Sequence, residues 1–214
     1  MVDLQLPSPK PPPPHLSHVR FLHQGLETAQ PQRKRDRTRA RLIWATAYML
    51  AQKGPDRLRA PDIAALAGVS PGAFYSYFTD RDDAAQQVLA ALAERFYVLD
   101  DPAAPTGPAA LQEVIERQLA MAQANGGLLR ALEATPRLER RLAERRGAWI
   151  GEVSARLRAS PCAARPPRQA DTGAALDAML WGASRRLSMR GVVGGERERL
   201  ARSIAAMWAA SLSL

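Results

Sequence analysis

Two short helical patterns joined by a tight turn constrain the fold of this chain more than any other feature. The first pattern covers residues 61–67 and begins with Pro61, a residue well suited to the first position of a helix. Gly68 then suits the left-handed conformation that ends many helices. Ser70 suits the capping position before the second pattern, at 71–78. The sequence therefore predicts two helices joined by a glycine turn, which is the helix-turn-helix arrangement.

The second of these helices has two different faces. Phe74 and Phe78 are four residues apart and share one face, which we expect to be buried. Tyr75 and Tyr77 flank the opposite face, which carries only small side chains: Gly72, Ala73 and Ser76. A face of small residues can lie deep in the major groove of DNA, where flanking hydroxyl groups reach the phosphates. The alternative is that the tyrosine rings only cover the hydrophobic core.

Amphipathic patterns of three- and four-residue spacing run through much of the remaining chain, in which aromatic and β-branched residues are few. No strand pattern stands out, so the sequence predicts an all-α protein. We expect these further helices: 38–53, 82–99, 109–124, 127–133, 136–159, 171–190 and 196–212.

The inventory of reactive side chains argues against an enzyme. Cys162 is the only cysteine, which excludes an intrachain disulfide. We expect the proline-rich segment 1–32 to be disordered, and it holds all three histidines: His15, His18 and His23. The predicted folded body then lacks a histidine for a catalytic triad or zinc site, and we expect neither cofactor nor metal. Catalysis by a carboxylate pair such as Glu113 and Glu116 stays open.

Charge and hydropathy favour a nucleic-acid partner over a membrane. The formal net charge is +9 and the calculated isoelectric point is about 10.7. Residues 33–59 hold nine Lys or Arg against two Asp, and Arg33–Arg41 would serve as a flexible arm along DNA or as a solvated linker. No apolar run long enough to span a membrane and no secretion signal appears, so we expect a cytoplasmic protein.

Three stretches resemble, in order and spacing, the DNA-binding domain of TetR-type transcriptional regulators: TRARLIWATAYMLAQKG, DIAALAGVSPGAFYSYF and TDRDDAAQQVL. The resemblance covers residues 38–92 and implies DNA contacts at Thr38, which begins the first helix, and at Arg81, which opens the fourth. It also implies contacts by recognition-helix positions, namely Ser70, Gly72, Ala73, Tyr75 and Tyr77; the wheel adds Ser76. Arg59 and Ala60 stand where the family commonly has threonine, and we expect Arg59 to replace the lost phosphate contact.

The resemblance further implies a homodimer that binds a palindromic operator in double-stranded DNA and represses transcription until a small ligand releases it. A ligand-independent activator or an architectural DNA binder with the same motif is the alternative. The domains would be the extension at 1–32, whose role the sequence does not assign, the helix-turn-helix domain with its basic arm at 33–82, and a regulatory and dimerisation domain at 83–214.

Two sets of residues in the second domain are candidates for its functions. Those on inward helix faces are either plain core or the lining of a pocket for an apolar or aromatic ligand: Phe96, Met121, Leu132, Trp149 and Met179. The apolar residues of the last two helices either pack inside the subunit or form an isologous dimer interface: Leu176, Leu180, Leu187, Leu200, Ile204 and Trp208.

Overall fold

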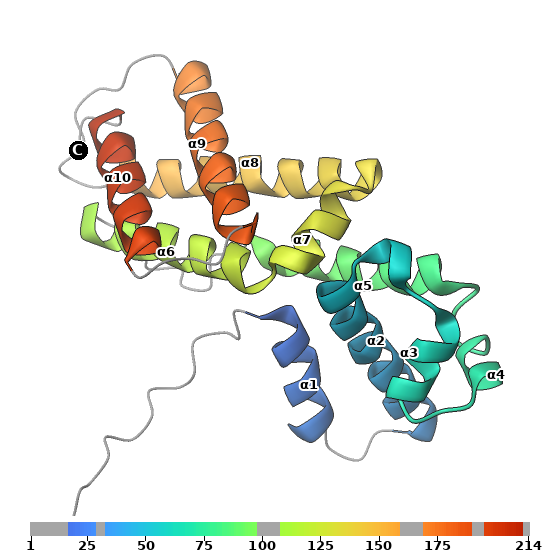
Figure 1. Ribbon diagram of the computed structural model, residues 1–214. Helices are drawn as coiled ribbons and strands as arrows, with labels where there is room; N and C mark the ends of the chain where they lie inside the picture. The colour runs from blue at the N-terminus through green and yellow to red at the C-terminus, as the bar shows by residue number, and fades with distance from the viewer. Residues whose placement is uncertain (1–16, 29–32, 98–107, 159–168, 190–194, 212–214) are drawn as a thin grey trace, which may run out of the picture.

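The computed structural model describes residues 17–28, 33–97, 108–158, 169–189 and 195–211, and these residues form helices without strands, as the sequence predicted (Figure 1). In chain order the helices are α1 (His18–Thr28), α2 (Lys34–Lys53), the short 3₁₀ helix η1 (Pro55–Arg57), α3 (Ala60–Leu66), α4 (Pro71–Phe74), α5 (Arg81–Phe96), α6 (Pro108–Ala124), α7 (Gly126–Glu133), α8 (Pro136–Arg158), α9 (Gln169–Met189) and α10 (Glu196–Ser211).

Helix α2 is the centre of the smaller, N-terminal part of the fold. Helices α1, α3 and α5 all pack against α2, and α4 packs against α3. The apolar side chains Leu42 and Leu50 of α2 are fully buried, together with Ile63 of α3 and Phe74 of α4. Helix α5 leads from this part to the larger part, where α6 to α10 pack on one another (Figure 1).

The structure corrects the expectation of a disordered N-terminal extension over residues 17–28. These residues include an eleven-residue helix, α1, whose Val19 and Leu22 pack against the hydrophobic core. The backbone N–H of His18 donates to Asn125 Oδ1 at 2.7 Å, and the Arg95 guanidinium carbon lies 3.5 Å from the centre of the Phe21 ring. The Ser17 hydroxyl oxygen accepts from the Arg20 N–H at 3.4 Å at the start of the helix, and a short helix becomes stable when tertiary contacts hold its apolar face. The proline-rich residues 7–14 lie outside the described residues.

His18 also overturns the expectation that the folded body lacks histidine. Its side chain is 1% exposed, and its Nδ1 atom lies 3.0 Å from Arg95 Nη1. Burial and the neighbouring Arg95 charge lower its pKa from 6.5 to about 4. The ring is therefore neutral at neutral pH, and α1 contacts both α2 and the turn that joins α6 to α7.

The two parts of the fold meet closely where α7 begins. A Cβ atom on Gly127 would lie 2.3 Å from the carbonyl oxygen of Ala51 on α2, so only glycine permits this approach. Arg130 Nη1 on α7 donates at 3.0 Å to the Ser188 carbonyl at the end of α9. Helix α7 therefore contacts both the end of α2 and the end of α9.

Candidate nucleic-acid interface

The glycine turn between α3 and α4 has the geometry that the sequence predicted. Gly68 has φ +65°, and its N–H donates to the Ala65 carbonyl at 3.0 Å. A guanidinium nitrogen of Arg41, on α2, donates to the carbonyls of Ala67 and Gly68. The Arg41 side chain thus holds the turn by donating hydrogen bonds to carbonyl groups that the end of α3 leaves without a helical partner. A Cβ atom on Gly68 would lie 2.6 Å from the same nitrogen.

Helix α4 begins as expected but ends early. Ser70 caps it by accepting a hydrogen bond from the Ala73 N–H at 3.3 Å, and Pro71 follows in the first turn. The regular helix stops at Phe74, because the N–H groups of Ser76 and Tyr77 donate three residues back, as in a tighter turn. The predicted helix 71–78 is therefore one α-helical turn followed by turn-like backbone.

The faces of this segment follow the predicted division. Phe74 and Phe78 are 0% and 2% exposed, and their ring centres lie 5.4 Å apart. Tyr75 is 59% exposed and meets Phe74 edge-on at 5.4 Å. The small polar residues around it are also exposed: Ser70, Gly72 and Ser76. Ala73 and Tyr77 are partly buried, and Tyr77 packs against the core, so Tyr75 is the more accessible of the two tyrosines.

The three predicted contact residues outside the turn have mixed surroundings. Arg59 is exposed before α3, where no side chain caps the helix. Arg81 is 44% exposed, but its Nη1 donates to the Leu58 carbonyl at 2.8 Å, which holds the segment before α3 against the start of α5. Thr38 was expected to begin the first helix, but α2 starts at Lys34, four residues earlier. The Thr38 hydroxyl donates to the Lys34 carbonyl at 3.0 Å.

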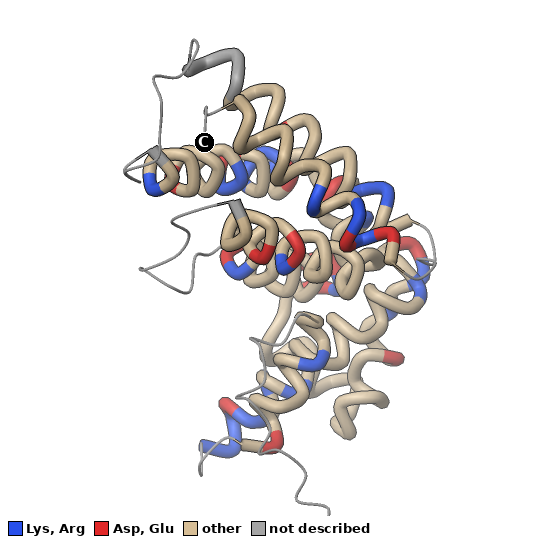
Figure 2. Tube along the Cα trace, turned by 90° about the vertical axis from the view of Figure 1, so that its left-hand side faces the viewer, with Lys and Arg blue, Asp and Glu red and all other residues tan. Residues whose placement is uncertain are grey.

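The basic segment 33–41 is also different from the expected flexible arm. From Lys34 onward it forms the first turns of α2, so its side chains have fixed directions around a helix. Five basic residues of these turns and the preceding cap are exposed: Arg33, Lys34, Arg35, Arg37 and Arg39. Figure 2 shows Lys and Arg gathered at the lower end of the molecule, the level at which α2 begins in Figure 1. The helix thus presents a fixed basic end beside the turn.

Two arginines of the same segment have structural roles that the sequence did not reveal. Arg41 supports the glycine turn, and Arg39 donates to Gln87 Oε1 on α5 at 2.5 Å. Gln87 in turn donates to Asp83 Oδ1 at 2.9 Å, and the Thr79 N–H donates to its other oxygen. These hydrogen bonds hold the pKa of Asp83 below its usual range. Arg39 is as exposed as the other basic residues of the segment, so only the distant partners of Arg39 and Arg41 reveal these structural roles.

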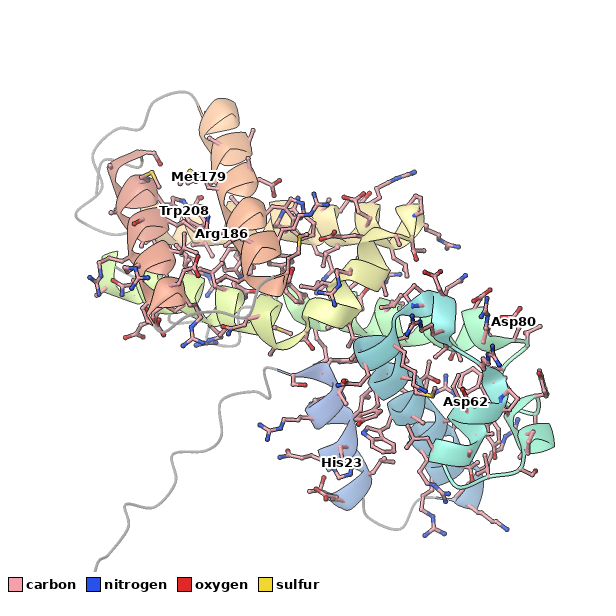
Figure 3. The ribbon with its side chains drawn as sticks, in the orientation of Figure 1. His23, Asp62, Asp80, Met179, Arg186 and Trp208 are labelled. Carbon is pink, nitrogen blue, oxygen red and sulfur yellow. The ribbon has the colours of Figure 1, made fainter. Side chains whose placement is uncertain are left out.

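The start of α5 is fixed by its own cap. Asp80 Oδ1 accepts from the N–H groups of Asp82 and Asp83 at 2.9 and 2.8 Å. Figure 3 shows Asp80 at the right-hand edge of the molecule, near the end of α4. We refer to the glycine turn and α4, residues 67–74, as the recognition turn. The segment that follows it is therefore anchored to α5, the helix that leads into the larger part of the fold.

The predicted pocket residues lie mainly in the core of the larger part. Phe96, Met121, Leu132 and Trp149 are buried, and Met179 is partly buried. The structure brings Trp149 and the end of α5 together, since the Phe96 ring meets Tyr97 at 5.1 Å and Tyr97 meets Trp149 at 5.8 Å.

The residues predicted for the dimer interface mostly pack inside the subunit instead. Leu176, Leu180, Leu187, Ile204 and Trp208 are at most 4% exposed, and Leu200 is partly buried against the core. These apolar residues pack against α6 and α8, because a helix that packs on one side turns its most hydrophobic face inward. The exposed residues of α9 and α10 include small side chains, Ala175, Ala178, Gly182, Ser203, Ala206 and Ala210, and also Met207 and the arginines Arg185, Arg186, Arg199 and Arg202.

Other classes of site find little support in the described residues. None of their acidic, histidine or cysteine side chains form a group of three or more that could hold a metal ion. None of their helices is both long and apolar enough to cross a bilayer.

Comparison with known proteins agrees with the geometry of the turn. Residues 42–88, which run from α2 into α5, match the family described as bacterial regulatory proteins, tetR family. These residues are therefore similar to the N-terminal domain of TetR-type transcriptional regulators. A search among curated proteins found no match.

Solved TetR-type structures extend the similarity in fold beyond this domain. A protein from Mesorhizobium loti described as a TetR-family transcriptional regulator is 19% identical, with a TM-score of 0.65 over 84% of this chain and 98% of that one. A TetR family regulator from Marinobacter aquaeolei is 20% identical, with a TM-score of 0.60 over 84% and 98%. The multidrug binding protein EbrR, solved with imidazole, is 25% identical, with a TM-score of 0.54 over 84% and 96%. The Mesorhizobium loti and Marinobacter aquaeolei proteins are described as TetR-family regulators, which are not enzymes, and this agrees with the expectation for this chain.

Proposed function

We propose that this chain is a transcriptional repressor that binds a palindromic operator as a homodimer and leaves the DNA when a small molecule binds to its second domain. The observation that carries the proposal is the exposed face of the turn and α4. There Tyr75 and three small polar residues stand outward over two buried phenylalanines, in a domain that matches the TetR type. Such a face fits the major groove, and the Tyr75 hydroxyl reaches toward the groove wall.

The basic start of α2 supplies the contacts that do not depend on base sequence. Lys34, Arg35 and Arg37 are exposed on the first turns of this helix, and Arg59 is exposed at the start of α3. Cations so placed neutralise phosphates and release counterions, so they raise affinity for any duplex. Arg81, whose guanidinium already holds the Leu58 carbonyl, positions the start of α5.

The exposed faces of α9 and α10 are the proposed dimer interface. On α9, Ala175, Ala178 and Gly182 follow one another at helical spacing, and on α10 Ala206 and Ala210 do the same. Small side chains let two helices approach closely, and the neighbouring Met207 is 52% exposed. A two-fold axis that pairs these faces would form a four-helix interface between two copies of the chain.

Helix α5 is the proposed connection between ligand and DNA. It begins beside α4 and ends at Phe96, with Tyr97 next in the core of the second domain. A ligand that binds one orientation of α5 better than the other shifts the spacing of the two recognition turns in the dimer. The DNA-bound orientation would then become less populated.

Selection from a random DNA library, read by sequencing, tests the proposed DNA binding. We expect enrichment of a palindrome with two half-sites related by a two-fold axis. No enrichment at low salt would contradict the proposal. A promoter template that carries the recovered sequence then tests the direction of regulation: fewer transcripts in the presence of the protein indicate a repressor, whereas more transcripts indicate an activator.

A charged residue on the proposed interface tests the dimer. Ala178→Glu places a carboxylate on the exposed face of α9, and we expect monomers in sedimentation experiments and loss of cooperative operator binding. Ala155→Glu makes the same change at an exposed position of α8 and should leave a dimer. Dimers of Ala178→Glu that match the wild type would place the interface elsewhere.

A further inference from the structure

Four large side chains meet at the centre of the second domain. The ring centre of Trp149, on α8, lies 5.8 Å from that of Tyr97 and 6.1 Å from that of Trp208, on α10. Arg146 precedes Trp149 by less than one turn on α8. Figure 3 shows Trp208 in the region between α10 and α9. We refer to Tyr97, Arg146, Trp149 and Trp208 as the donor cluster; their exposed fractions are 4%, 5%, 2% and 0%.

The donor cluster has buried hydrogen-bond donors without acceptors. The Nε1 atoms of Trp149 and Trp208 are buried and make no hydrogen bond. An indole nitrogen can only donate. The Tyr97 hydroxyl and the Arg146 guanidinium interact with each other. Burial raises the pKa of Tyr97 above its ordinary value, so its hydroxyl keeps its proton at neutral pH. The cluster therefore offers two indole N–H donors and the Tyr97 O–H group at one place.

Asp177 does not supply the missing acceptor. Its two oxygens accept from Arg146 Nε at 2.5 Å and Arg146 Nη2 at 2.9 Å, which leaves Nη1 as the third nitrogen of the same guanidinium. Trp181 covers another side of Arg146, with the guanidinium carbon 4.5 Å from its ring centre. Arg146 is thus held by Asp177 and Trp181 of α9, and it also interacts with Tyr97.

Several unpaired donors in one buried cluster are unusual in a folded protein. Each buried donor without a partner costs roughly 1–3 kcal/mol, and native structures contain few of them. In an enzyme or binding protein, such groups commonly form hydrogen bonds with a bound molecule. The aromatic rings around them would contact the flat faces of that molecule.

We propose that the donor cluster binds a planar aromatic molecule whose polar group is a hydrogen-bond acceptor, a carboxylate or a ketone, and that it rejects cationic amines. An acceptor oxygen receives the indole N–H groups, whereas an ammonium group meets those same donors and the Arg146 charge. The inference rests on the proposed function, since this molecule would be the ligand that releases DNA. Tyr97 connects the site directly to α5, the helix that leads to the recognition turn.

Three probes with the same ring system separate acceptor from donor: 2-naphthoate, 2-acetylnaphthalene and 2-(aminomethyl)naphthalene. Isothermal calorimetry on the full-length chain at pH 7 and without DNA measures their binding. We expect the carboxylate and the ketone to bind at least roughly tenfold more tightly than the amine, because each hydrogen bond lost in a buried site has this order of effect. An amine that binds as tightly as the carboxylate, or no binding by any probe, would overturn the proposal.

Matched tryptophan variants locate the site. Trp208→Phe keeps an aromatic ring and removes one N–H donor, so 2-naphthoate should bind roughly tenfold more weakly. Trp44→Phe makes the same change on α2, far from the cluster, and should leave binding unchanged. Trp149→Phe provides a second variant if Trp208→Phe does not fold. Unchanged binding by a folded cluster variant refutes the assignment.

These outcomes are separate from those of the DNA selection. Failure of the naphthalene experiments with a recovered palindrome would leave a DNA-binding regulator without this ligand class. Failure of the selection with tight, Trp208-dependent binding of 2-naphthoate would instead refute the regulator and leave the binding site.

Discussion

Protonation of His18 is expected to release α1 as the pH falls from neutral to about 4. The folded structure lowers the pKa of His18 from 6.5 to about 4, first through burial and second through the positive charge of Arg95. The unfolded or undocked helix therefore binds a proton between these pH values, whereas the docked helix does not. Docking is fully favourable above pH 6.5 and weakens as the pH falls through this range.

The size of the effect follows from the shift. One pKa unit corresponds to about 1.4 kcal/mol, so a change from 6.5 to about 4 gives about 3 kcal/mol of docking free energy. The site can carry such an effect because His18 is 1% exposed, with Arg95 Nη1 3.0 Å from Nδ1. A proton on Nδ1 would place two positive charges in contact and remove an acceptor from Arg95.

Hydrogen exchange read by mass spectrometry measures this docking. Amides of residues 18–28 should lose protection between pH 6.5 and 4, after correction for the intrinsic pH dependence of exchange. His18→Gln stays neutral throughout and keeps an acceptor oxygen. Its amide protection at pH 6.5 should be lower than in the wild type. Its docking free energy should fall by about 3 kcal/mol less than that of the wild type between pH 6.5 and 4.

His23→Gln is the matched control, because His23 is on the same helix with a side chain that is 48% exposed. The His23 ring meets that of Trp44 on α2 at 5.3 Å, so we expect this variant to have lower protection but the same change with pH as the wild type. Parallel pH curves for the wild type and His18→Gln would refute the reasoning, since the buried ring would then have no part in the loss of protection.

Three further predictions concern the interface with DNA. Gly68→Ala should destabilise the domain by about 1–2 kcal/mol in thermal unfolding, because φ is +65° and the new Cβ atom would lie 2.6 Å from a guanidinium nitrogen. Gly72→Ala, where a Cβ atom meets nothing within 4 Å, should keep its stability. Arg35→Ala should reduce the slope of log affinity against log salt by about one, whereas Arg140→Ala on α8 should not. Tyr75→Phe should weaken operator binding several-fold with unchanged melting; unfolding without a change in binding would show that the ring belongs to the core.

Much of the DNA-binding domain could be predicted because its signals are local. Gly68 ends α3 in a left-handed conformation and Ser70 caps α4, each through atoms only a few residues away. The burial of Phe74 and Phe78 follows from helical spacing alone. For the same reason the predicted long helices differ from the observed ones by only a few residues at most ends.

The position of each arginine and of α1 depended on the tertiary structure. Arg41 and exposed Arg37 belong to one basic run, yet the Ala67 and Gly68 carbonyls give Arg41 a structural role. Helix α1 is stable through partners as distant as Asn125, which no local pattern reveals.

Sequence alone determined the helical class, the recognition turn and its two faces, because hydrophobic spacing and capping act within one or two turns. Only the tertiary structure decided which apolar faces stay inside the subunit, as for Trp208, and which donors are left without an acceptor in the core. The physical reason is that burial and hydrogen-bond satisfaction depend on neighbours that folding brings from distant parts of the chain.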